Sequence, residues 1–220
     1  NLNIQSSNIS IDKKQKLTIF EGDVVATDVN NNIFKTNYAE YKKDLKLLES
    51  KDKTTILTSK GYFLTGKNII FDNKNNFIKS KFPASIKDLE NNNIFLENFE
   101  YSTSNNFFKS IGKIRVIDSK GNKYNFSQIY IDEKKKEIIG TDIKSFLNEE
   151  NFKIYDENKP RVFANTVKID GQKNEFFKST FTLCDYRKDD KCPPWTLRAE
   201  KMIHDKKKKT IYYDNAVIKV

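Results

Sequence analysis

The stretch from Thr180 to Val220 reads TFTLCDYRKDDKCPPWTLRAEKMIHDKKKKTIYYDNAVIKV, and it indicates the fold class of the whole chain. Inside it, apolar residues alternate with polar ones at Trp195, Leu197, Ala199 and Ile203. A second short-period run follows at Ile211, Tyr213, Ala216 and Ile218. The polar segment 204–209 between them suits a turn, so the pattern predicts strand, turn, strand. A helix over 198–208 is the alternative, because Ala199, Met202 and Ile203 also fit a period of 3.6.

A short phrase returns along the whole chain: an apolar residue, Asp, a few Lys, Asn or Gly residues, and an apolar residue again. Aspartate suits such turns because its carboxylate accepts a hydrogen bond from the backbone N–H two residues on. Several steps between these aspartates are 14 or 16 residues, which fits strands of five to seven residues joined by tight turns. The aspartates are Asp12, Asp28, Asp44, Asp72, Asp88, Asp118, Asp132, Asp156, Asp170 and Asp205.

The repeat predicts an all-β fold of many short antiparallel strands. No linker rich in Pro, Gly or Ser interrupts the 220 residues, so a single domain over 1–220 is expected. Hydrophobic residues make up only 37% of the chain and charged residues 32%, which predicts a thin, elongated core to which the 17 Phe contribute much of the area.

The formal net charge of +10 favours an acidic partner such as an anionic lipid or a phosphorylated glycolipid. Nucleic acid is disfavoured, because the cations are nearly all Lys rather than the Arg that reads phosphates and bases bidentately. The lysine runs at 134–136 and 206–209 each lie in an expected turn, where a solvated surface is the simpler interpretation.

The sequence offers no pattern typical of catalysis. His204 is the single histidine, Cys184 and Cys192 are eight residues apart, and the seven glycines form no phosphate-binding loop. We therefore expect no enzyme, no cofactor and no metal site. No window of 18 apolar residues exists, so no transmembrane helix is expected, and the start at Asn1 without a signal peptide suggests a mature or trimmed product.

The end of the chain also resembles a known family. A Cys-containing loop is followed by Pro-Trp-x-apolar-x-Ala, then apolar-His-Asp, a Lys-rich turn and Tyr-x-x-Asn-Ala. The order is similar to the end of the N-terminal periplasmic domain of LptD, the lipopolysaccharide-assembly outer-membrane protein. The matching residues are Cys184, Pro194, Trp195, Leu197, Ala199, Ile203, His204, Asp205, Tyr212, Asn215 and Ala216.

The segment from Phe20 to Thr27, with 34–39 after it, is similar to the first strands of the OstA-like domain that LptA, LptC and LptD share. The resemblance implies an OstA-like β-jellyroll of two splayed antiparallel sheets, whose open groove holds acyl chains. It also implies that a full-length protein continues past Val220 into an outer-membrane barrel.

The expected function is lipopolysaccharide transport to the outer membrane of a Gram-negative cell, by a periplasmic domain that accepts acyl chains and passes them to the barrel. The implied partners are lipopolysaccharide, an LptA-like jellyroll paired through an edge strand near 7–11 or 16–25, the barrel, and its LptE-like lipoprotein plug. The alternatives are a soluble LptA-type bridge protein and a structural or adhesive β-solenoid.

By alternation, ten residues are expected to face the groove and bind lipid, with Glu21, Asp23 and Thr27 facing outward. In the family, cysteines of this domain are linked to the barrel; here Cys184 and Cys192 are expected either to bond to each other or to remain free. The groove candidates are Phe20, Val24, Phe34, Phe63, Phe71, Phe95, Phe126, Ile131, Val167 and Ile169.

Overall fold

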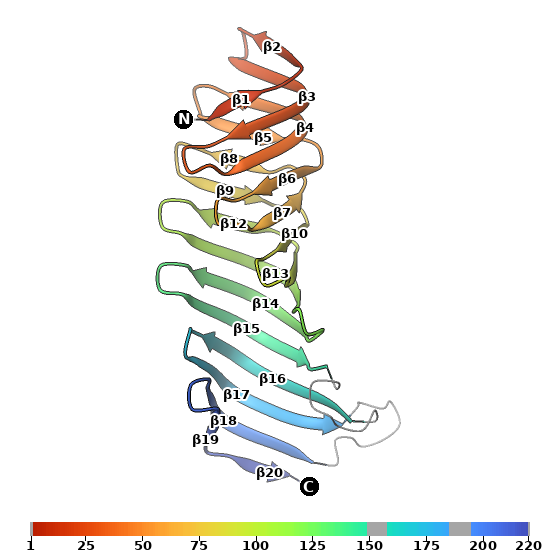
Figure 1. Cartoon of the computed structure of the whole chain (residues 1–220), viewed down its shortest axis with the longest axis vertical. Helices are drawn as coiled ribbons and strands as arrows, with labels where there is room; N and C mark the ends of the chain where they lie inside the picture. The colour runs from red at the N-terminus through yellow and green to blue at the C-terminus, as the bar shows by residue number, and fades with distance from the viewer. Residues whose placement is uncertain (1, 149–157, 185–194, 220) are drawn as a thin grey trace. The chain divides into compact units, whose positions relative to one another are not determined.

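The computed structural model describes residues 2–148, 158–184 and 195–219, and these residues form antiparallel β-strands with no helix among them (Figure 1). The all-β, jellyroll-like prediction is confirmed. The strands are β1 (Asn3–Gln5), β2 (Asn8–Asp12), β3 (Leu17–Thr27), β4 (Ile33–Lys42), β5 (Leu47–Ser50), β6 (Thr54–Leu57), β7 (Phe63–Gly66), β8 (Ile70–Asp72), β9 (Phe77–Ser80), β10 (Ala84–Lys87), β11 (Asn93–Leu96), β12 (Phe99–Ser102), β13 (Phe107–Ile117), β14 (Lys123–Asp132), β15 (Glu137–Phe146), β16 (Asn158–Ile169), β17 (Lys173–Cys184), β18 (Thr196–Asp205), β19 (Thr210–Asp214) and β20 (Val217–Lys219).

The chain divides into two compact units, which we call unit 1 (Asn1–Ser110) and unit 2 (Ile111–Val220). In unit 1 the strands form two ladders. Ladder A runs through β2, the first half of β3, the second half of β4, β5, β8, β9 and β12. Ladder B runs through β1, the second half of β3, the first half of β4, β6, β7, β10 and β11.

The long strands bend so that each contributes to both ladders. In β3 the register shifts between Glu21 and Val24, where Gly22 and Asp23 adopt positive φ of 74° and 48°. In β4, Thr36 and Ala39 are both buried although they lie three residues apart, which a regular strand would place on opposite faces. The bends therefore let the two ladders face each other across an apolar interior.

This interior is filled by alternate residues of both ladders. Phe34, Leu48 and Ile69 are each less than 2% exposed, and the rings of Phe34 and Phe71 meet edge to face with centroids 4.8 Å apart. Burial of such side chains is the main favourable term in folding, at about 1.5–3 kcal/mol for each.

Buried serines form hydrogen bonds to the backbone where the chain crosses between the ladders. Ser50, Ser80 and Ser110 follow one another at intervals of 30 residues. The hydroxyl of Ser80 donates to the carbonyl of Lys67 at 2.9 Å, and that of Ser110 donates to the carbonyl of Asn98 at 2.6 Å. The crossovers leave backbone groups outside the ladders, and these hydroxyls satisfy some of them.

The turns follow the expected aspartate chemistry. The Oδ1 atom of Asp28 accepts hydrogen bonds from the backbone N–H groups of Asn30 and Asn32, both at 2.9 Å. Asp88 and Asp118 make the same bonds 60 and 90 residues later. The turns also stack, because the Asn32 side chain accepts from the N–H of Ser59 in the next turn at 2.9 Å.

In unit 2, β14 to β18 pair consecutively, and β19 and β20 both pair with β18. The segment 196–205 is strand β18, so the helix alternative over 198–208 is wrong; pairing with β17 and β19 overrides the helical periodicity. The core of unit 2 contains Ile143, Ala164 and Val167. The loop that contains Cys192, and the side chain of Cys184, lie outside the described residues.

Among the described strands, β1 and β2 each pair with β3 only, and β19 and β20 each pair with β18 only. Of the two expected locations for an edge, 7–11 corresponds to β2. The other, 16–25, corresponds to β3, which pairs with β1 and β2 on one side and with β4 on the other. That second location is therefore wrong, because β1 and β2 cover the strand.

Candidate functional site

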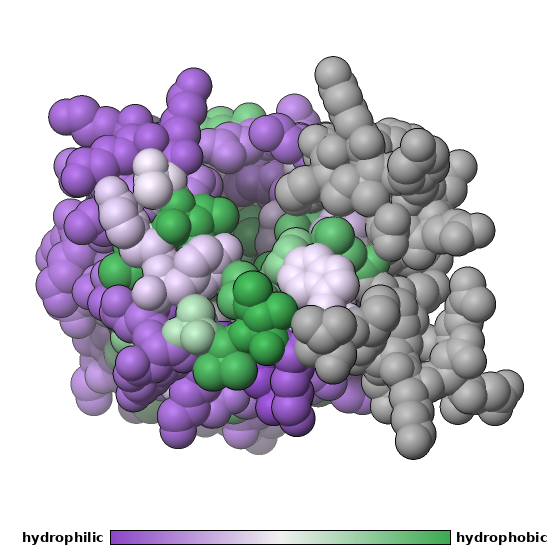
Figure 2. Space-filling view, turned by 90° about the horizontal axis from the view of Figure 1, so that it is seen from below, coloured by the Kyte–Doolittle hydropathy of each residue, from purple (hydrophilic) through white to green (hydrophobic). Residues whose placement is uncertain are grey.

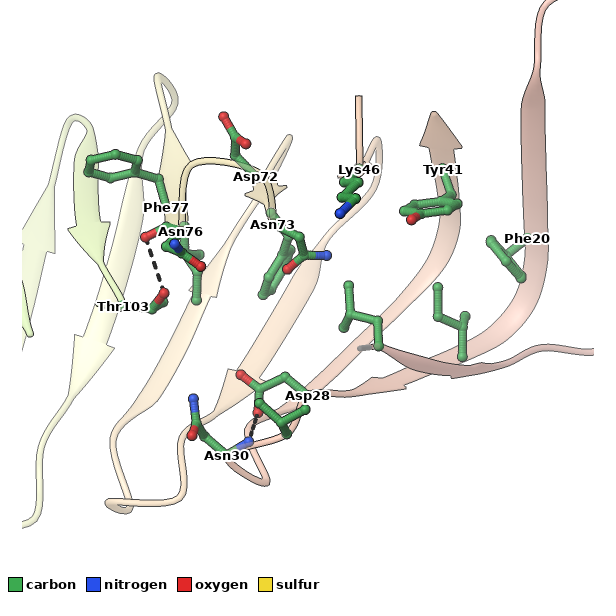
Figure 3. A pocket seen from close by; sticks show the side chains of 15 residues that line it. Phe20, Asp28, Asn30, Tyr41, Lys46, Asp72, Asn73, Asn76, Phe77 and Thr103 are labelled. Carbon is green, nitrogen blue, oxygen red and sulfur yellow. Dashed lines mark hydrogen bonds between the residues drawn. The ribbon is translucent and has the colours of Figure 1, made fainter. Parts of the chain in front are cut away.

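Unit 1 contains a cavity of about 620 Å³ between ladder A, β1 and the turns at their ends (Figure 3). The lining combines apolar side chains from four strands with polar side chains from the turns. It consists of Leu2, Ile4, Phe20, Asp28, Val29, Asn30, Tyr41, Lys46, Phe71, Asp72, Asn73, Asn76, Phe77, Ile78 and Thr103.

The strands supply the apolar part of the lining. Phe20, Phe71 and Ile78 project inward from β3, β8 and β9 and are each less than 9% exposed. Ile4, which pairs with buried Ala26, adds an aliphatic wall from β1. Phe20, Phe71 and Ile78 belong to the packed interior of unit 1 and form the floor of the cavity.

The turns supply two polar rims, which lie on opposite sides of the cavity in Figure 3. Asp28 and Asn30 form one rim. The other carries Lys46, Asn73 and Asn76, from successive turns that are joined by main-chain hydrogen bonds. The N–H of Asn73 donates to the carbonyl of Lys46 at 3.0 Å, and that of Thr103 donates to the carbonyl of Asn76 at 2.9 Å.

The carboxylates at these rims are held in place by their own turns. The side chain of Asn75 donates to Asp72 at 2.9 Å and, with the Asn75 N–H, lowers the pKa of that carboxyl. The side chain of Asn32 donates to the Oδ2 atom of Asp28 at 2.7 Å. Both groups therefore act as turn braces, whereas Lys46 and the exposed asparagine amides present hydrogen-bond donors at the mouth.

This arrangement suits binding rather than chemistry. An apolar floor can contact hydrocarbon, and amides and an ammonium at the mouth can bind a polar or anionic group. Among the residues that the structure describes, no cluster of three His, Cys, Asp or Glu side chains could hold a metal ion. The same residues include no helix long and apolar enough to cross a membrane.

The structure brings some of the ten groove candidates together. Phe20 and Phe71 line the cavity, and Val24 and Phe34 lie deeper, at 0% and 1% exposure. In unit 2, Phe126 and Ile169 pack against the core that contains buried Val167, and Ile131 is half-buried. Whether any of the ten contacts lipid stays a prediction.

Two of the ten groove candidates face solvent rather than the interior. Phe63 and Phe95 are 45% and 37% exposed, so the inward orientation expected for them is wrong. Their neighbours Leu64 and Leu96 take the inward positions instead, at 8% and 3% exposure. Each of these short strands has apolar residues on both faces, and alternation alone cannot tell which face is the core. Of the expected outward positions, Glu21 and Asp23 are exposed and Thr27 is half-buried.

Sequence reasoning missed the wall from β1 and the inward side chain of Ile78. Leu2 and Ile4 do show the i, i+2 spacing of a strand face, which is the signal that could have identified them. The polar rims could be predicted only as turns, because stacking of turns 30 residues apart depends on the ladders.

No protein-family model matches the sequence, and no curated protein is similar to it. Among solved structures, the chain is similar to LptH, described as the LptA-homologous periplasmic component of the lipopolysaccharide transport device of Pseudomonas aeruginosa. The identity is 18%, the TM-score is 0.26, and the match covers 60% of this chain and 76% of that chain. A similarity at this TM-score assigns neither a family nor a function, so the function has to be argued from the cavity and its rims.

Proposed function

We propose that this protein takes part in lipopolysaccharide transport and that it binds the acyl chains in the cavity of unit 1. The observation that carries the proposal is an apolar floor formed by Phe20, Phe71 and Ile78 between two polar rims. Each methylene moved from water into such a site contributes about 0.8 kcal/mol. An amphiphile with its hydrocarbon inside and its headgroup at the mouth satisfies both parts of the lining.

The rims favour a headgroup rich in hydrogen-bond acceptors. Lys46 and the amides of Asn73 and Asn76 can donate to phosphate or sugar oxygens. The net charge of +10 supports an anionic ligand in general. These features suit a phosphorylated glycolipid better than a fatty acid, whose single carboxylate would use few of the donors.

The location that fits this function is the periplasm. Two finer versions of the role are possible. In one, the chain is the N-terminal domain of an LptD-type protein, which passes lipid to an outer-membrane barrel with an LptE-like plug; the motif from Pro194 to Ala216 supports it. In the other, the chain is a soluble LptA-type bridge, for which the cavity alone suffices. The coding sequence downstream of Val220 distinguishes the two.

The partner in either version is a second jellyroll that pairs with an edge strand. Ile9 and Ile11 of β2 are 57% and 67% exposed on a strand that has one neighbour among the described residues. An unpaired edge of this kind is a template for strand addition. Replacing both with lysine should weaken capture of an LptA-like partner and leave the melting temperature nearly unchanged. Undiminished capture would exclude this edge.

Photo-crosslinking in cells that make lipopolysaccharide tests the cavity directly. A photoreactive residue at Ile4 is expected to label lipid, because Ile4 lines the cavity. The adjacent Gln5 is exposed and is the matched control, since consecutive strand residues point to opposite faces. Equal labelling at both positions, or none at Ile4, would contradict the proposal.

A structural β-solenoid is the second candidate, and the stacked turns favour it. Asp28, Asp88 and Asp118 repeat one turn geometry, as adhesive or scaffold repeats do. A solenoid of this kind needs no ligand. Purified protein that neither carries nor takes up lipopolysaccharide would therefore favour the scaffold.

A further inference from the structure

Three turns, two of them rich in lysine, lie side by side at one end of the unit 2 sheet (Figure 1). Pairing of Ile138 with Ile169 places turn 132–136 beside turn 170–172, and pairing of Lys173 with Asp205 places the latter beside turn 205–209. The N–H of Lys206 donates to the carbonyl of Gln172 at 2.9 Å, which joins the last two turns. We call this row, with Lys173, the lysine rim.

The lysine rim is strongly cationic. It has eight lysines and four acidic residues, and segment 206–209 alone contains four consecutive exposed lysines. The lysines are at 134–136, 173 and 206–209, and the acidic residues are Asp132, Glu133, Asp170 and Asp205.

Three of the four carboxylates accept hydrogen bonds from backbone N–H groups at their own turns. Asp132 accepts from the N–H of Lys135 at 3.0 Å, Asp170 from that of Lys173 at 2.7 Å, and Asp205 from that of Lys208 at 2.9 Å. These backbone bonds hold the carboxylates at the bases of the turns. Lys135 also forms an ion pair with Asp132 at 3.3 Å, and the Nζ atom of Lys206 donates to the carbonyl of Asp170 at 3.0 Å. The exposed lysines of 207–209 are therefore the part of the rim that a partner meets first.

Exposed apolar side chains adjoin the lysines. Ile211 and Tyr212 follow the last lysine within three residues and are 48% and 44% exposed. The Nζ atom of Lys208 lies 6.0 Å from the centre of the Tyr212 ring. Figure 2, seen from the end where β19 and β20 lie, shows hydrophobic side chains gathered next to hydrophilic ones.

We propose that the lysine rim, together with Tyr212, docks unit 2 onto the surface of an anionic lipid bilayer. The negative surface potential of such a bilayer attracts lysine ammonium groups, and an aromatic or aliphatic side chain beside them can enter the headgroup region. The apolar neighbours and the absence of arginine in these turns favour a lipid surface over nucleic acid. The proposal does not depend on what the cavity of unit 1 binds.

Flotation of the 220-residue chain with vesicles tests the docking. Vesicles of phosphatidylcholine with about one third phosphatidylglycerol should retain the protein, pure phosphatidylcholine vesicles should not, and salt should release it. The triple variant K207Q/K208Q/K209Q should bind the anionic vesicles at least tenfold more weakly. Tyr212→Ser should weaken binding severalfold and make the remainder more salt-sensitive, because the apolar part is lost.

The matched control is K35Q/K53Q/K87Q, which removes three exposed lysines from unit 1 and should bind as the unchanged protein does. Circular dichroism verifies that each variant is folded. Equal loss in both triple variants would reduce the effect to net charge and overturn the proposal, as would equal binding to the two kinds of vesicle. Tighter binding to a DNA duplex than to vesicles, lost in the rim variant, would overturn it in favour of a nucleic acid partner.

Discussion

At the scale of single residues, small polar side chains hold together the places where the chain crosses between ladders. Ser50 is fully buried, and its hydroxyl oxygen accepts from the N–H of Ile69 at 3.0 Å and donates to the Ile69 carbonyl at 3.4 Å. Ile69 is itself fully buried, so water cannot take the place of the Ser50 hydroxyl as acceptor for its N–H group. The hydroxyl therefore satisfies a backbone group that the ladders leave unpaired.

Ser50→Ala should lower the free energy of unfolding by about 1–3 kcal/mol, because it leaves a buried N–H without an acceptor. Urea unfolding measures this loss. Ser10→Ala in exposed β2 is the matched control and should change stability by less than about 0.5 kcal/mol. Similar values for the two variants would show that the N–H of Ile69 finds another acceptor.

Gly140 provides a second test at this scale, because Phe126 lies against it. A Cβ atom at position 140 would come within 2.6 Å of the Phe126 ring. Gly140→Ala should therefore displace the ring and destabilise the protein by roughly 1–3 kcal/mol through overpacking. If the cause is the ring, the double variant with Phe126→Leu should recover part of that loss, and no recovery would contradict this explanation.

Prediction of the buried face from the sequence succeeded where the apolar residue has a polar neighbour, and it failed where both neighbours are apolar. Phe20, Val24 and Phe34 are buried as predicted, and each has one polar neighbour, Glu21, Asp23 and Lys35 respectively. Phe63 and Phe95 stand next to Leu64 and Leu96, and only the ladder pairing decides which of the two neighbours is buried. The cavity lining also depends on which strands meet across the interior, and no single strand contains that information.

At the scale of elements, the turns are the elements that the sequence predicts most directly. Asp72 and Asp170 each accept hydrogen bonds from groups in their own turn, from Asn75 and from Gln172 and Lys173 respectively. The pKa of both carboxyls is lowered, by the side-chain bond from Asn75 for Asp72 and by backbone bonds for Asp170. What the sequence does not reveal is the bend at Gly22 and Asp23, since β3 reads there as one continuous strand.

Stability should consequently fall in acid. The folded pKa of these carboxyls lies below the unfolded value of about 4, so their contribution is full above that value and is lost as the pH falls through the folded pKa. Urea unfolding at pH 7 and pH 3 measures the loss. Asp72→Asn should cost about 1–2 kcal/mol at pH 7 and less at pH 3, because the pH is then below the unfolded pKa and part of the carboxylate's contribution is already lost. An equal cost at both pH values would show that the charge is not what stabilises the turn.

At the scale of the whole molecule, the structure describes two units, and we propose that they unfold as one cooperative domain. Strand β13 (Phe107–Ile117) continues through the boundary between Ser110 and Ile111. A domain boundary normally falls in an exposed linker rather than within a strand. The sequence gives the same indication, because no segment rich in Pro, Gly or Ser occurs there.

Two probes of urea unfolding test this cooperativity. The only tryptophan, Trp195, lies in unit 2 and its fluorescence reports on that unit, whereas far-ultraviolet circular dichroism reports on the strands of both. We expect coincident midpoints, because a single cooperative domain has no populated intermediate. Ser50→Ala, which weakens unit 1, should then lower the Trp195 midpoint as much as the dichroism midpoint. If the Trp195 midpoint stays fixed while the dichroism splits into two steps, the units are separate domains and the lysine rim belongs to an independently folding half.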